Sequence, residues 1–194
     1  MRDQTWWYVS RAGGIVAWAL AALAVIWGLQ LSTRLIRKPA PAWVLDLHRF
    51  LGGLAVVFVG VHLLGLALDS FFSFGLVELF VPFASPYQPT EVALGVVAFY
   101  LLLAVEVTSL LMKKMPRRIW RRVHYASYAV FVLGTMHGLL AGTDGDNALF
   151  QWACLIVSGI VLYMTLVRIL APKGAPPGRA SARRAALDRG DIAG

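Results

Sequence analysis

The stretch WRRVHYASY at residues 120–128 is followed by an apolar run that ends at His137. An earlier stretch, DLHRFLGG at residues 46–53, leads through a second apolar run to His62. The four histidines of the chain stand near the two ends of these two runs: His48, His62, His124 and His137. An ionisable side chain inside a membrane segment is costly and rare, so by default it marks a functional site.

Composition places the chain among integral membrane proteins. Of its 194 residues, 59% are hydrophobic, and its mean hydropathy of +0.69 is far above that of soluble domains. The single cysteine, Cys154, excludes a disulfide framework and a thiolate metal cluster and is interpreted as a small buried apolar side chain. The net charge of +8 does not indicate nucleic acid here, because in a membrane protein the side that carries the charge matters.

The pattern of apolar segments predicts an all-α, polytopic membrane helix bundle with five transmembrane helices. A spanning helix needs roughly 20 residues, and the segments that qualify lie at about 11–31, 43–68, 91–112, 119–141 and 148–171. A short interfacial helix and loop, acting as a lid, is expected at about 70–85, which is punctuated by proline and rich in phenylalanine. Residues 1–171 form the predicted bundle, and residues 172–194 a disordered basic tail.

Charges sort between the two sides of the predicted membrane. Nearly all Lys and Arg residues lie in the connections at 34–38 and 113–122 and in the tail. The charged residues of the other two connections are all acidic. The positive-inside rule then predicts a multi-pass protein of the cell membrane, with its N-terminus outside and its C-terminus in the cytoplasm.

In this topology the second and fourth spans are parallel, so the histidines form two levels. His48 and His124 lie near the cytoplasmic face, and His62 and His137 near the outer face. Their separations of 14 and 13 residues put the levels roughly 20 Å apart. Zinc and copper sites usually need three or four protein ligands, whereas a haem iron needs two axial ones, so haem fits the ligand count best.

The neighbours of the histidines agree with haem but also have plainer explanations. The glycines near them would let a flat macrocycle approach, or would simply let helices pack closely: Gly52, Gly53, Gly60, Gly65, Gly134 and Gly138. Arg49, Arg121 and Arg122 lie at the depth where an inner haem would direct its propionates, although positive charge there is also a topology signal.

Two points of geometry and chemistry stay open. A 14-residue step returns a straight helix to within about 40° of the same face, but a 13-residue step leaves it about 140° off, so the fourth span needs curvature, a π-bulge or flexible glycines. Glu106 and Asp46 either relay protons or bond a ligand histidine, or pair with a nearby arginine, which we favour. Met112, Met115, Met136 and Met164 are interpreted as flexible packing residues rather than haem ligands. Tyr125, Tyr128 and Trp120 could line an electron path, although Trp120 is better interpreted as an interface anchor.

The histidine spacings, together with the tryptophan, two arginines and histidine at 120–124, resemble the ferric reductase-like transmembrane domain. That family includes ferric reductases, NADPH oxidases and the haem subunit of bacterial methionine sulfoxide reductase. The resemblance implies two haem b groups, His48 with His124 holding the inner one and His62 with His137 the outer one. It also implies a b-type cytochrome that carries electrons from a cytoplasmic flavoprotein to an extracytoplasmic acceptor.

Larger members of that family carry their own flavin and nicotinamide domain, which the short tail here leaves no room for. The expected partners are therefore membrane lipid, a separate cytoplasmic flavin reductase or small reduced carrier, and an extracytoplasmic redox partner or ferric substrate, with no nucleic acid. The chain would then be an oxidoreductase subunit. The alternatives are a haem-free proton or ion pathway, and a structural membrane partner with one haem or none.

Overall fold

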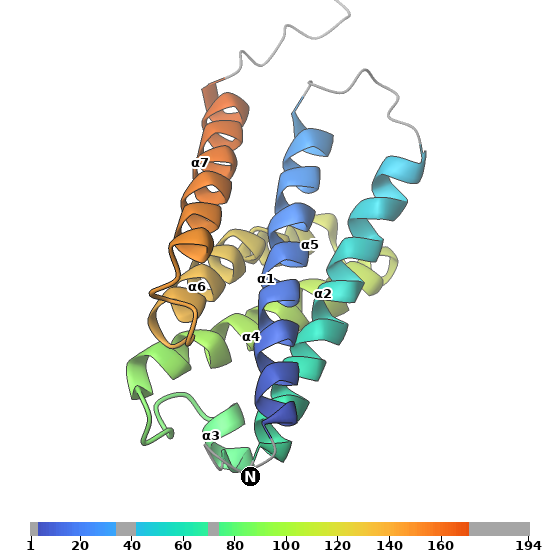
Figure 1. Cartoon of the computed structure of the whole chain (residues 1–194). Coiled ribbons are helices and arrows are strands. Elements are labelled where there is room, and N and C mark those ends of the chain that lie inside the picture. Colours follow the sequence, from blue (N-terminus) through green and yellow to red (C-terminus); the bar gives the residue numbers. More distant parts are fainter. Residues whose placement is uncertain (1–3, 34–41, 70–73, 171–194) are drawn as a thin grey trace, which may run out of the picture.

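The computed structural model describes residues 4–33, 42–69 and 74–170. The predicted tail at 172–194 and the whole of the basic 34–38 connection lie outside these residues. Within them every regular element is helical, as predicted (Figure 1). The elements are α1 (Thr5–Ser32), α2 (Ala42–Leu68), α3 (Leu76–Phe80), α4 (Pro89–Leu110), the 3₁₀ turn η1 (Met112–Lys114), α5 (Arg117–His124), α6 (Ala126–Leu140) and α7 (Ala148–Leu170).

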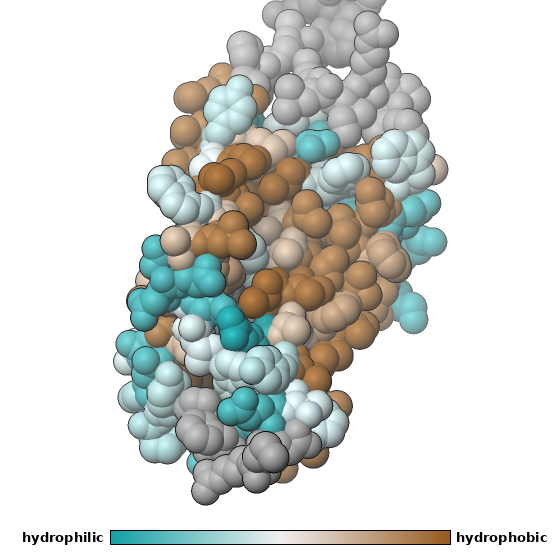
Figure 2. All heavy atoms as spheres, viewed as in Figure 1, coloured by the Kyte–Doolittle hydropathy of each residue, from teal (hydrophilic) through white to brown (hydrophobic). Residues whose placement is uncertain are grey.

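Four of the described helices are long and apolar enough to cross a membrane, namely α1, α2, α4 and α7. They agree with the first, second, third and fifth predicted spans, and they make the chain a multi-pass membrane protein. Figure 2 shows apolar side chains gathered over the middle of one face of the molecule. Exposed leucine, valine and phenylalanine side chains on α2, such as Phe50, Val57 and Leu64, are suited to contact with lipid.

The fourth predicted span is divided into two helices. The α5 helix ends at His124 and α6 begins at Ala126, with a turn at Tyr125 and a short-range hydrogen bond from the Tyr128 amide to the Tyr125 carbonyl, 3.2 Å. With 15 residues, α6 is only about 22 Å long. This break lies directly after one candidate ligand, so it changes the angle between His124 and His137 that a straight helix would impose. It is neither a π-bulge nor a glycine kink.

The helices associate as two antiparallel pairs. The α1 and α2 helices make the most extensive contact, and α4 with α6 the next, while α1 also contacts α6 and α7. In Figure 1, α1 and α2 lie side by side in front of α4, α5 and α6. Each pair contributes two of the four histidines, because α2 carries His48 and His62, and the α5–α6 segment carries His124 and His137.

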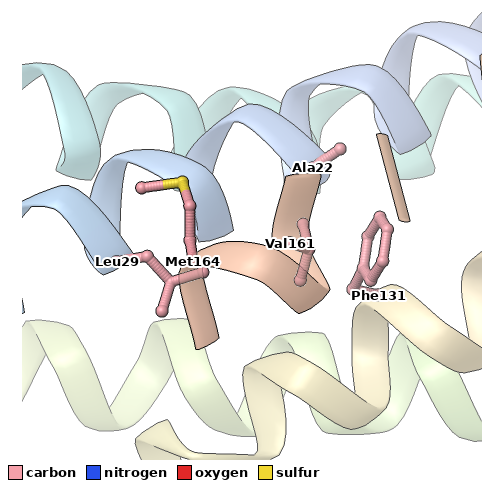
Figure 3. Packing of buried hydrophobic residues seen from close by; sticks show 5 residues of the cluster. All are labelled: Ala22, Leu29, Phe131, Val161 and Met164. Carbon is pink, nitrogen blue, oxygen red and sulfur yellow. The ribbon is translucent and has the colours of Figure 1, made fainter. Parts of the chain in front are cut away.

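A buried apolar cluster joins α1 to α6 and α7. Its members are Ala22 and Leu29 from α1, Phe131 from α6, and Val161 and Met164 from α7 (Figure 3). Met164 therefore has the packing role that was predicted for it. Cys154 is also buried in α7, 2% exposed, in agreement with its interpretation as a small core side chain.

The helix predicted at about 70–85 is short. The five-residue α3 falls inside that range, while residues 70–73 lie outside the described part of the chain. Phe80 of α3 packs against Phe99 of α4, with ring centres 5.9 Å apart, and the Tyr100 hydroxyl donates to the Phe80 carbonyl at 2.8 Å. These contacts fix α3 against the middle of α4.

Candidate functional site

The four histidines meet as two pairs, and each pair combines one histidine from α2 with one from the α5–α6 segment. The ring centres of His48 and His124 are 6.0 Å apart, and those of His62 and His137 are 6.3 Å apart. In both pairs the two rings are close to perpendicular, at 73° and 79°. The pairing is the one expected from parallel second and fourth spans.

Three of the histidines are oriented by backbone carbonyls from the other helix of their own pair. The Nδ1 atom of His48 bonds the Ala24 carbonyl at 3.0 Å, that of His62 the Ser10 carbonyl at 2.8 Å, and that of His137 the Glu91 carbonyl at 2.9 Å. A carbonyl only accepts, so in each case Nδ1 carries the hydrogen. The other ring nitrogen, Nε2, is then left with its lone pair free to bind a metal.

His124 is held differently from the other three. Its Nδ1 lies 3.4 Å from the hydroxyl of Ser109 on α4, a longer contact than the carbonyl bonds. Its ring also stacks on Trp120, one turn earlier in α5, with ring centres 5.0 Å apart and an angle of 24°. Trp120, predicted as an interface anchor, is thus in direct contact with a candidate ligand.

Three glycines let the histidine rings approach the neighbouring helix. A Cβ atom on Gly14 would lie 3.0 Å from His62 Nδ1, one on Gly28 would lie 3.1 Å from His48 Cε1, and one on Gly95 would lie 2.7 Å from His137 Cε1. None of these three glycines was singled out from the sequence. For two of them a sequence signal existed, because Gly14 and Gly28 are separated by 14 residues, as His48 and His62 are.

The glycines that were singled out have different surroundings. Gly65 packs against the backbone of Ser10, which is the close helix packing given as the plainer explanation. Gly53, Gly60 and Gly134 have open space where a Cβ would stand. Of these, Gly134 lines a cavity.

That cavity, of about 260 Å³, lies at the His62–His137 pair. Both histidines line it, together with Gly14, Gly95 and Gly134, and most of its other walls are apolar or aromatic. Arg11 and Asp144, also in its wall, form an ion pair between the start of α1 and the loop after α6. The Arg11 Nε atom donates to Asp144 Oδ2 at 2.5 Å, and Asp144 is 8% exposed.

The three arginines predicted to meet propionates lie on the surface. Arg49, Arg121 and Arg122 are all exposed, and Arg49 has only a loose ion pair with the exposed Asp46, 3.6 Å. Their cofactor-binding role stays a prediction. Glu106 has no arginine partner among the described residues; its carboxylate lies against Gly52, one turn after His48 in α2.

The geometry of both pairs fits a metal ion between the rings. An imidazole nitrogen lies about 2.0 Å from an ion that it binds and about 1.1 Å from its own ring centre, so two rings on opposite sides of one ion have centres about 6.2 Å apart. The observed 6.0 and 6.3 Å match this value. No group of three or more His, Cys, Asp or Glu side chains able to hold a metal is found in the described chain. The protein thus places two histidines at each level, a number that would suit an ion whose other ligands come from a macrocycle.

Two buried donors lack a hydrogen-bond partner among the described residues, and one of them, on Trp120, lies beside the His48–His124 pair. The indole N–H groups of Trp27 and Trp120 are the only buried side-chain N or O atoms without a hydrogen-bond partner in the described part of the protein. The Trp120 ring stacks on His124, whereas the Trp27 ring packs against Trp43, with ring centres 6.5 Å apart. A buried unsatisfied donor costs about 1–3 kcal/mol, so both indoles call for an acceptor that the described residues do not supply.

Comparison with known proteins agrees with this geometry. The family model described as "Ferric reductase like transmembrane component" matches residues 13–135, more than half of the chain. The chain belongs to this family. The matched part of this ferric reductase-like protein contains His48, His62 and His124, and His137 follows two residues after it. Neither the curated proteins nor the solved structures compared with the chain gave a match.

Proposed function

We propose that this ferric reductase-like protein is a b-type cytochrome subunit that carries electrons across the cell membrane through two bis-histidine haems. The observation that carries the proposal is the pair of imidazole spacings, 6.0 and 6.3 Å, each suited to one iron. His48 and His124 hold the inner haem, and His62 and His137 hold the outer one. When bound, haem supplies the one-electron couple between ferrous and ferric iron.

The residues of the chain bind, orient and insulate. The carbonyls of Ser10, Ala24 and Glu91 fix three histidine tautomers, which leaves Nε2 as the nitrogen that would bind the iron. Gly134 leaves room in the outer cavity where a side chain would intrude. The indole N–H groups of Trp27 and Trp120 are suitable donors to the carboxylates of the inner haem. The apolar walls keep water from the redox centres.

The proposal includes five crossings, with α5 and α6 together as the fourth. Lys113, Lys114, Arg117 and Arg118 are exposed and lie between α4 and Trp120, which supports a cytoplasmic location for this connection. The N-terminus is then outside and the C-terminus inside. A separate cytoplasmic flavoprotein is the electron donor, and a ferric compound or an extracytoplasmic redox protein is the acceptor.

The test is the haem content of the purified protein in detergent. We expect two haems per chain and the visible spectrum of low-spin b-type haem, with two midpoint potentials in a redox titration. Replacing His62 or His137 by alanine should remove the outer haem and leave the inner one, whereas His48→Ala or His124→Ala should remove the inner haem. A colourless protein after expression with ample haem supply would refute the proposal.

A further inference from the structure

The contacts that orient the histidine rings repeat along α1 and α4. We use the word seat for a carbonyl that accepts a hydrogen bond from Nδ1 together with a small residue, four positions later, against which the ring packs. On α1 the seats are Ser10 with Gly14 and Ala24 with Gly28, so both members recur after 14 residues. This step equals the separation of His48 and His62 on the antiparallel α2.

The same step of 14 residues on α4 leads from a seat with a glycine to a position with a different small residue. Glu91 and Gly95 form the seat of His137. A step of 14 residues from each arrives at Val105 and Ser109, so a serine replaces the glycine. The Ser109 hydroxyl donates to the Val105 carbonyl at 2.7 Å, and the same oxygen lies 3.4 Å from His124 Nδ1. The same hydroxyl thus contacts both the Val105 carbonyl and the His124 ring.

We propose that Ser109 is a positioning residue that relays the Val105 carbonyl to His124 and thereby sets the reduction potential of the inner haem. This inference rests on the proposed function, in which the histidine pairs bind haem. A strong acceptor at Nδ1 makes the imidazole more electron-donating, which favours ferric iron and lowers the potential. A hydroxyl at 3.4 Å is a weaker acceptor than a direct carbonyl at 2.8–3.0 Å. Ser109 thus keeps the inner haem at a higher potential than a fourth glycine would.

Two substitutions at the same position should act in opposite directions. Ser109→Gly removes both hydroxyl and Cβ, so the ring of His124 can settle on the Val105 carbonyl, and the inner potential should fall. Ser109→Ala removes the hydroxyl but keeps the Cβ, which holds the ring away and leaves Nδ1 without an acceptor. The inner potential should then rise, and haem affinity should weaken about tenfold, as is usual when a ligand histidine loses its partner.

The experiment is a spectroelectrochemical titration of the full-length protein with both haems bound. Ser109→Thr keeps the hydroxyl, so the reduction potential of the inner haem should stay close to the wild-type value. Thr165→Ala on α7 is the matched control, because the Thr165 hydroxyl also donates to a carbonyl within its own helix, that of Val161 at 2.7 Å, but bonds no histidine. It should shift neither potential.

Shifts of the same sign for Ser109→Gly and Ser109→Ala, or no shift in either, would overturn the relay if the wild-type protein contains two haems. A wild-type protein without haem contradicts the proposed function itself. The two failures are therefore distinguishable in one series of preparations.

Discussion

Replacing Gly95 by alanine should displace His137 and empty the outer site. The new Cβ would lie 2.7, 2.8 and 2.9 Å from three ring atoms of His137, whereas ordinary contact begins at 3.4 Å. The ring must therefore move by about 0.7 Å, away from the Glu91 carbonyl that it bonds at 2.9 Å. Overpacking of this kind costs about 1–3 kcal/mol, which corresponds to a loss of outer-haem affinity of about 5- to 150-fold.

The assay is the haem-to-protein ratio of the purified variant, read with the two potentials, so that the loss can be assigned to one haem. Gly53→Ala on α2 is the control: a Cβ there meets nothing within 4 Å, and its helix should gain up to about 1 kcal/mol from the better helix former. If Gly95→Ala retained both haems with unchanged affinity and potentials, the packing of His137 against α4 would not determine ligand position.

Three further outcomes follow from contacts described above. Gly134→Ala should leave the thermal stability of the haem-free protein unchanged or higher, yet lower outer-haem occupancy, because its Cβ enters the cavity; equal occupancy would mean that haem does not use this space. Asp144→Asn should lower the stability to denaturant by roughly 1–2 kcal/mol, because Arg11 loses a buried partner, whereas the exposed Asp146→Asn should not. Trp120→Phe keeps a stacked ring but removes the N–H group, so transfer of the inner haem to an excess of apomyoglobin should be about tenfold faster, and an unchanged rate would show that this donor does not hold the haem.

The sequence was sufficient for the helical class, four of the spans and the pairing of the histidines. Alternating apolar runs and charged connections determine which helices are parallel, and this puts His48 opposite His124 and His62 opposite His137. The ring distances agree with that arrangement. The periodicity of apolar residues could not locate the turn at Tyr125, because the residues on both sides are good helix formers in lipid and no proline or glycine marks the break.

The sequence also gave little sign of which residues orient the ligands. Carbonyl acceptors have no side-chain signature, so the Ser10, Ala24 and Glu91 seats on α1 and α4 were missed. Glycines were sought beside the histidines in sequence, whereas those in contact, Gly28 and Gly95, lie on the neighbouring helix.

The histidine seats have a consequence for assembly. Each imidazole is steered by the helix with which its own segment forms a hairpin, never by the opposite half of the bundle. Under the proposed function, each hairpin thus prepares both of its histidines before the halves meet, and the entropy of ordering those side chains is lost during folding rather than during metal capture. Closing one half on the other would then bring all four histidines into position in a single docking event.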